Sequence, residues 1–224
     1  MVTFFSKGGL FMWPLLLCSI VTVTTIVLAA LTLRQKKVLP LVIESEIERL
    51  VPGGSPERLL RIVNDDSSSL AGVVRTALQH LRWPRSENIE SVQTRARREL
   101  VRLERGLIVL EVVTGIAPLI GLIGTVSGLV HVFSGLGLSG GSDTKGVALG
   151  ISEALNCTIF GLSIAVPALI GFSYFSKKVE VMSVEMESLV SDLIAKIYYG
   201  RVPREEMPPP SRSTAPAPSR APIA

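Results

Sequence analysis

The sequence predicts an all-α membrane protein with three transmembrane helices. Three apolar runs support this prediction: Leu10–Leu33, Leu107–Phe133 and Val147–Phe175. The 224-residue chain is 47% hydrophobic and only 19% charged, and its mean hydropathy is +0.45. A soluble domain carries about a quarter charged residues. The composition therefore argues against a soluble enzyme and against an intrinsically disordered chain.

Each apolar run is long enough to cross a bilayer. A spanning helix needs about 20 apolar residues, and the second and third runs would form helices of roughly 40 and 44 Å, which continue beyond the lipid. The first run exceeds the apolar stretch of about 7–15 residues in a cleaved signal peptide, and basic residues follow it. We expect it to remain as a transmembrane helix.

The distribution of basic residues predicts the orientation. Residues 34–105 hold 14 basic and 10 acidic residues, whereas the link between the second and third runs has one of each, Lys145 and Asp143. Lys7 is the one basic residue before the first run. Because cytoplasmic flanks carry an excess of Lys and Arg, the N-terminus and the link are predicted outside, and residues 34–105 and the C-terminus in the cytoplasm.

The region after the first run has a helical pattern. Apolar residues recur at i, i+3, i+4, i+7, i+8 and i+11 over 70–81, which predicts an amphipathic helix that Ser67–Ser69 can cap. A turn at 52–56 separates it from a helical stretch near 41–50, and Trp83-Pro84 marks its end.

Both later membrane helices are predicted to extend into the cytoplasm. From about Ser86 an apolar pattern runs into the second membrane helix without a breaker. After Phe175 a similar pattern continues the third helix by about six turns. The chain shows no β pattern and no internal repeat.

These patterns divide the chain into consecutive segments. Their order is an outside N-terminus and first transmembrane helix (1–33), a cytoplasmic helical region (34–106), the second transmembrane helix (107–136), a short periplasmic link (137–146), the third transmembrane helix (147–176), a cytoplasmic helical extension (177–202) and a Pro-rich tail predicted to be disordered (203–224). A polyproline docking site in the tail is the alternative to a featureless one.

The sequence gives little support for enzymatic or nucleic-acid chemistry. The net charge of +4 is too small to indicate nucleic acid as a partner. Cys18 and Cys157 both lie in apolar runs, so neither a disulfide framework nor a zinc site is expected. No nucleophile–base pair, phosphate loop or metal cluster is recognisable, and we expect no cofactor. The glycines of 135–141 fit a flexible turn between two membrane helices better than a nucleotide loop.

Small and hydroxyl residues form patterns within the membrane helices. Thr114, Pro118, Gly121 and Thr125 share one face of the second helix. Small-xxx-small pairs, which let helix backbones approach closely in lipid, occur at Gly124 and Gly128 and at Gly146 and Gly150. The alternative for each threonine is a hydrogen bond to its own helix, without functional meaning.

Glu153 is the charged residue of the third run. A carboxylate in an apolar helix normally faces a cavity, a partner or the bundle interior, although a water-reached position at the mouth of the helix is the alternative. Asn156 and Cys157 lie near its face, whereas Thr158 is about 140° away on an ideal helix. Pro167 could distort the helix and change this relation. Glu111 and His131 are expected at the two membrane interfaces, and a pH-sensing His131 is the alternative.

Several of these blocks resemble the ExbB/TolQ/MotA proton-channel family, most closely its ExbB/TolQ branch. The blocks are 117–128 (APLIGLIGTVSG), 150–155 (GISEAL), 158–162 (TIFGL) and 165–168 (AVPA). MotA-like chains have four membrane helices, whereas this one has three. Ser127 stands where many relatives have an aromatic residue, and the Pro-rich tail lies outside the family pattern.

The resemblance implies a homopentamer in the bacterial inner membrane. Its central pore would hold the single membrane helices of two ExbD/TolR-like subunits, whose aspartate takes up and releases protons. This chain has no aspartate within its membrane runs. Carried over by motif, Thr125, Thr158 and Glu153 belong to the proton pathway. Helix packing is expected of six residues: Gly121, Gly124, Gly128, Gly150, Gly161 and Pro167.

The implied function is a motor driven by the proton-motive force rather than an enzyme. It would energise a TonB/TolA-like periplasm-spanning protein for transport or envelope maintenance. Two other hypotheses remain: a structural membrane scaffold with a cytoplasmic interaction module, and a membrane-embedded hydrolase, for which the helices lack a Ser/His or metal constellation. Under the scaffold hypothesis Thr125→Ala and Thr158→Ala leave function intact, while Gly124→Leu destroys assembly.

Overall fold

The computed structural model describes residues 11–138 and 144–199, and the described part is helical throughout. The helices are α2 (Met12–Thr32), α3 (Gln35–Val38), α4 (Leu41–Arg49), α5 (Glu57–Asp65), α6 (Ser69–Gln79), α7 (Arg85–Glu104), α8 (Leu107–Leu138) and α9 (Thr144–Tyr198). The all-α fold class is confirmed. The predicted tail at 203–224 lies outside the described residues, as does the centre of the link at 139–143.

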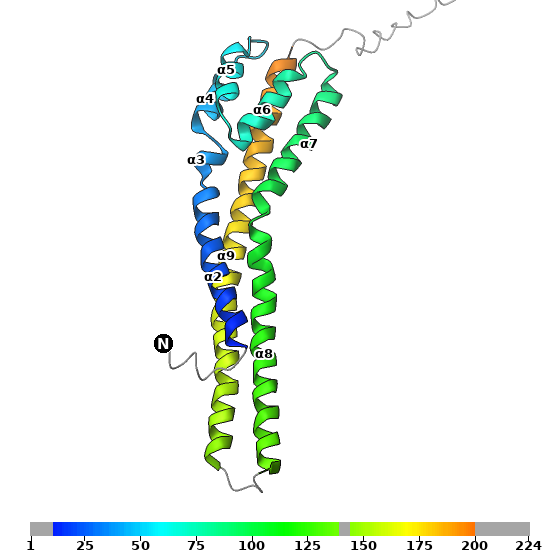
Figure 1. Ribbon diagram of the computed structural model, residues 1–224. Coiled ribbons are helices and arrows are strands. Elements are labelled where there is room, and N and C mark those ends of the chain that lie inside the picture. Colours follow the sequence, from blue (N-terminus) through cyan, green and yellow to red (C-terminus); the bar gives the residue numbers. More distant parts are fainter. Residues whose placement is uncertain (1–10, 139–143, 200–224) are drawn as a thin grey trace, which may run out of the picture.

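Three helices are long and apolar enough to cross a membrane: α2, α8 and the first part of α9. α8 and α9 form an antiparallel hairpin, and α2 packs against both (Figure 1). Helices α3–α7 gather at the other end of the molecule around the continuation of α9, and we call this unit the head (Figure 1). The chain is a multi-pass membrane protein.

α2 has the length of one membrane crossing and lies beside only part of the hairpin. Its 21 residues span about 31 Å, the thickness of a hydrocarbon core. Ile26 of α2 packs against Gly171, and Phe11, just before α2, lies beside Gly124. From Gly124 to Leu138, α8 continues for about 20 Å. The hairpin therefore extends well beyond the start of α2 (Figure 1).

Most of the apolar surface of α2 is uncovered in the single chain. Met12, Leu15 and Ala29 are buried against the hairpin, whereas Trp13 is 71% and Leu17 64% exposed. A helix that is apolar on all sides belongs in lipid or between subunits. The same exposure occurs along α8 and α9, where Leu119, Leu122, Ile159 and Val166, among others, are each more than half exposed.

The head has a conventional apolar core. The buried face of α6 consists of Leu70, Ala71, Val73, Val74, Ala77 and Leu78. It packs against α7 and against α9, where buried residues from Val179 to Ile197 recur at helical spacing. Burying a large aliphatic side chain contributes about 1.5–3 kcal/mol, so this core stabilises the packing of α6 and α7 on α9.

Three polar contacts fasten the head. The Arg75 guanidinium, on α6, donates to the carbonyls of Val63 and Asp66 at the end of α5. Lys196, near the end of α9, donates to the Ile47 carbonyl of α4 at 3.0 Å. The fully buried Asn88 amide donates to the Ala77 carbonyl at 3.0 Å and to the Tyr198 hydroxyl at 3.1 Å, so it joins α6, α7 and α9.

Several local predictions are confirmed. Ser68 caps α6, its hydroxyl accepting from the Ala71 N–H at 3.2 Å. α4 occupies the helical stretch expected near 41–50. α9 runs unbroken through Pro167 to Tyr198, which matches the predicted six-turn extension.

Other local predictions are wrong. The pattern predicted an uninterrupted helix from about Ser86 into the membrane, but the structure places a turn at Arg105–Gly106, after which the chain enters α8. Gly106 has a low helix propensity and nothing packs within 4 Å of its Cβ position, so the backbone can turn there. Two helices were not predicted: α3, whose four residues are too few for a periodic signal, and α5, in which Leu59, Ile62 and Val63 do recur at helical spacing.

The Asn88 contact predicts a stability effect. Asn88→Ala removes the hydrogen bond to a carbonyl in the last turn of α6 and leaves a buried polar group, which costs about 1–3 kcal/mol. We expect a lower thermal unfolding midpoint for the purified chain in detergent. Asn64→Ala, at an exposed helical asparagine, is the control; equal midpoints for the two variants would contradict the role given to Asn88.

Candidate functional site

Glycines bring α8 and α9 into backbone contact. A methyl group at Gly161 would stand 2.6 Å from the Ala117 carbonyl oxygen and 3.2 Å from the Gly121 Cα. A methyl group at Gly121 would stand 3.0 Å from the Cys157 carbonyl oxygen. A Cβ is not accommodated 2.6 Å from a backbone oxygen, and at 3.0–3.2 Å the neighbouring backbone would have to shift, so the close approach of the two helices favours glycine at both positions.

The contact continues toward the hairpin tip. Gly124 faces the Cys157 side chain, where a Cβ would lie 2.9 Å from the Cys157 Cβ. Gly128 faces the Cβ of Ala154 at the same distance, and Gly150 faces Val132. Gly121, Gly124, Gly128, Gly150 and Gly161 thus all lie at the α8–α9 interface. Pro167 is exposed on α9, and its role in packing stays a prediction.

A pair of hydroxyl groups lies within this interface. The Thr125 and Thr158 hydroxyls are in direct hydrogen-bond contact, one from each helix. Thr158 also donates to the Gly121 carbonyl at 3.2 Å, and Thr125 lies 3.1 Å from the same oxygen and 3.3 Å from the Ala154 carbonyl. Both threonines are half-buried. The structure therefore joins two residues that are 33 positions apart in the sequence.

The two threonine hydroxyls have fewer protons to donate than they have hydrogen-bond contacts. Each hydroxyl has one proton to donate and two acceptor lone pairs, and the two of them share two carbonyl oxygens. Each can therefore exchange one partner for another without leaving an unpaired donor. A pair that can both donate and accept, placed among apolar residues, can hydrogen-bond a carboxylate or a water chain without adding a fixed charge.

Glu153 lies close to this pair along α9. It is half-buried and precedes Ala154, whose carbonyl lies beside the Thr125 hydroxyl. Thr158 lies on the side of α9 that faces α8, together with the buried Ala154 and Cys157. Glu153 lies about one helical turn beyond the N-terminal end of α2, toward the hairpin tip, because Phe11 lies at the height of Gly124 and Cys157.

The other polar residues do not join the pair. Thr114 donates to the Leu110 carbonyl of its own helix at 2.9 Å, which is the local alternative considered for each threonine. Glu111 and His131 are exposed on α8. Groups of three or more His, Cys, Asp or Glu suited to a metal ion are absent from the described residues.

Some of the α9 residues that form the interface with α8 were not predicted from the sequence. Ala154, Cys157, Gly161 and Ala165 recur at i, i+3, i+7 and i+11, a row of small side chains that faces α8, and all are buried. The helical spacing of these small residues is visible in the sequence, but spacing alone does not say which neighbouring helix the row faces. Ala117 was likewise missed as the residue whose carbonyl touches Gly161.

Comparison with known proteins identifies the family. The profile of the MotA/TolQ/ExbB proton channel family matches residues 65–188, more than half of the chain and all of the α8–α9 contact. The chain belongs to this family. Similar curated proteins carry the ExbB name, which supports the ExbB branch.

The relatives differ in how much they share. A Synechocystis protein named putative biopolymer transport protein ExbB-like 1 is 34% identical over 178 residues, covering 75% of this chain and 67% of the relative. The biopolymer transport protein ExbB of Helicobacter pylori is 41% identical over 81 residues, 36% of this chain and 56% of the relative. The biopolymer transport protein ExbB of Xanthomonas campestris is 34% identical over 110 residues, which cover 49% of this chain and 44% of the relative. The matched part of the chain thus covers about two thirds of the length of the Synechocystis relative and about half of the length of the other two.

The tight contact predicts a difference between two glycines. Gly161→Ala places a methyl group against the Ala117 carbonyl, and overpacking of this kind costs about 1–3 kcal/mol. Gly115→Ala is the matched control, because nothing lies within 4 Å of its Cβ position. Unfolding in mixed detergent micelles should show a loss for Gly161→Ala and little change for Gly115→Ala; similar values would show that the helices do not depend on close approach.

Proposed function

We propose that this chain is the pore-ring subunit of a proton-motive-force-driven motor. Five copies surround a pore that holds two single-pass ExbD/TolR-like subunits. The motor energises a TonB/TolA-like periplasm-spanning protein for transport or envelope maintenance. The N-terminus and the hairpin tip face the periplasm, and the head faces the cytoplasm of a bacterial inner membrane.

The observation that carries the proposal is the Thr125–Thr158 hydroxyl pair. The two hydroxyls lie in a glycine-lined contact between two membrane helices, at the level where α2 begins. They supply hydrogen-bonding groups but no titratable one. The three membrane runs contain no aspartate, and Thr125 and Thr158 contact each other and backbone carbonyls rather than Glu111 or Glu153, so the proton carrier is assigned to a partner subunit. Glu153 provides a negative charge beside the pair on its outer side.

The uncovered apolar surface supports assembly. α2, α8 and α9 expose large aliphatic side chains in the single chain, which suits both lipid and neighbouring copies. The basic excess of 34–105 supports the proposed orientation. A scaffold without proton transport is the alternative, and the hydroxyl pair is the feature that favours the motor.

Proton flux tests the role of the pair. Thr158→Val keeps the shape of the side chain but removes the hydroxyl, and Thr158→Ser keeps the hydroxyl. A hydrogen bond to a charged group contributes about 1.5–3 kcal/mol, so we expect Thr158→Val to lower proton flux by about tenfold or more in liposomes holding the chain and its partner, and Thr158→Ser to retain most of it.

The control for this variant is Ser163→Ala. Ser163 is exposed on the same helix, and its hydroxyl donates only to the Ile159 carbonyl, at 2.7 Å. Its flux should stay at the level of the unmodified chain. Normal flux in Thr158→Val, with Ser163→Ala also normal, would favour the scaffold.

Native mass spectrometry tests the assembly. The chain should be expressed alone and with a single-pass neighbour that carries an intramembrane aspartate. We expect a five-copy ring that captures two copies of the neighbour. A monomer or dimer without affinity for such a protein would refute the pore-ring proposal.

A further inference from the structure

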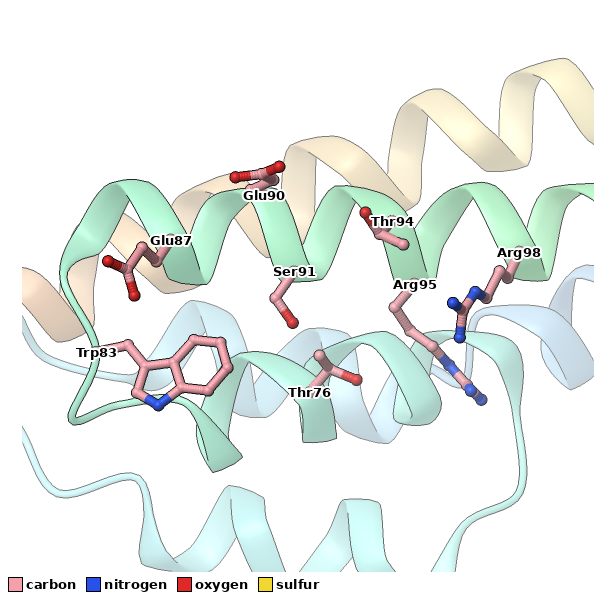
Figure 2. Close-up of a pocket in the computed structure, with 8 residues that line it drawn as sticks. All are labelled: Thr76, Trp83, Glu87, Glu90, Ser91, Thr94, Arg95 and Arg98. Atoms are coloured by element: carbon pink, nitrogen blue, oxygen red, sulfur yellow. The ribbon is translucent and has the colours of Figure 1, made fainter.

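A groove of about 520 Å³ runs between α6 and α7 on the head (Figure 2). It is remote from the α8–α9 hydroxyl pair and has no part in the function proposed above. Its lining is amphipathic: an aromatic ring, hydroxyl groups and charges of both signs. The lining residues are Thr76, Trp83, Glu87, Glu90, Ser91, Thr94, Arg95 and Arg98.

The charges of the groove are ordered along its length. Glu87 lies at the end that holds Trp83, whereas Arg95 and Arg98 lie at the other end (Figure 2). Arg95 already pairs with the buried Glu99 at 2.7 Å. Glu87 and Arg98 form no ion pair with another residue of the described chain. The groove is therefore acidic at the Trp83 end and basic at the other end, and each end carries one unpaired charge, Glu87 or Arg98.

The exposed indole suits an apolar or proline side chain. Trp83 is 46% exposed, and its ring stacks on the His80 imidazole with the centroids 3.9 Å apart. Aromatic residues that line a groove are the usual docking surface for extended Pro-containing segments.

α9 ends at the acidic and aromatic end of this groove. The Tyr198 hydroxyl donates to the Trp83 carbonyl at 3.0 Å. The chain beyond Tyr199 has 25 further residues, and it begins GRVPREEMPPP. Arg201, close to the exit point, and Arg204 are basic and flank Pro203, and Glu205 and Glu206 are acidic. Counted from α9, the segment is therefore basic first and acidic next, whereas the groove is acidic first and basic next.

We propose that residues 201–206 of the chain's own C-terminal segment bind in this groove in an extended conformation. Arg201 pairs with Glu87, Pro203 packs beside Trp83, and Glu206 pairs with Arg98. Docking ties the C-terminal segment to the α6–α7 hairpin and covers the exposed indole.

The distance between the two charged ends of the groove matches the distance between the charged residues of the segment. Glu87 and Arg98 are 11 positions apart on α7, which corresponds to about 16 Å along a helix. Arg201 and Glu206 are five positions apart, which corresponds to about 16 Å in an extended or polyproline chain. The entry point at Tyr198 fixes the direction, so that Arg201 meets the acidic end first.

Thiol cross-linking of the full chain in detergent tests the proposal. The variant carries Thr94→Cys, on the groove, and Met207→Cys, next to the docked acidic pair. A short bis-thiol reagent should join them within one chain several-fold more efficiently than it joins Gln93→Cys to Met207→Cys, because Gln93 is exposed on α7 but does not line this groove. Each single-cysteine variant reports any reaction with Cys18 or Cys157.

Charge reversal gives the second arm. Arg98→Glu should lower the cross-linking yield by about two- to fivefold, the effect of losing a surface ion pair worth up to about 1 kcal/mol, and Glu206→Arg in the same chain should restore it. Arg97→Glu, one residue away and outside this groove, is the control. Equal yields for Thr94 and Gln93, or a cross-link formed between two copies, would overturn the proposal.

Discussion

The close contact between α8 and α9 is the constraint on which the rest of the structure depends. In lipid, helices gain little from hiding apolar surface from one another, so van der Waals contact and hydrogen bonds hold them together. Gly121 and Gly161 let the two backbones meet, with a carbonyl oxygen where a side chain would otherwise stand. Without that approach, the Thr125 hydroxyl could not reach Thr158 or the Ala154 carbonyl on the other helix.

The other elements are arranged around this hairpin. α2 packs against both helices, the hydroxyl pair lies near the N-terminal end of α2, and the hairpin tip projects beyond that end. In the opposite direction α9 continues without a break into the head, where α6 and α7 close around it. One helix therefore connects the hydroxyl pair to the head, and a rigid helix is the kind of element through which a movement at one end can reach the other.

The sequence predicted the large features, because long apolar runs and periodic patterns have few alternatives. The three membrane helices, the capped α6 and the long extension of α9 are examples. It failed at smaller features: Gly106 allows a turn between α7 and α8, and α3 has too few residues to show a period. The contacts of Ala117 and Cys157 were not predicted either, because a helical spacing of small residues does not say which face of the neighbouring helix it meets; that depends on atomic fit that a single sequence does not contain.

In the proposed function, the Thr125 and Thr158 hydroxyls act as one unit in proton transport. A double-mutant cycle of proton flux tests this most directly. Flux would be measured for Thr125→Val, Thr158→Val and the double variant in liposomes containing the partner subunit. Groups that act as a unit are strongly non-additive, so the account predicts that the double variant is no slower than the slower single variant. If the two losses instead multiply, the hydroxyls act independently, and their contact across the α8–α9 interface is not what carries protons.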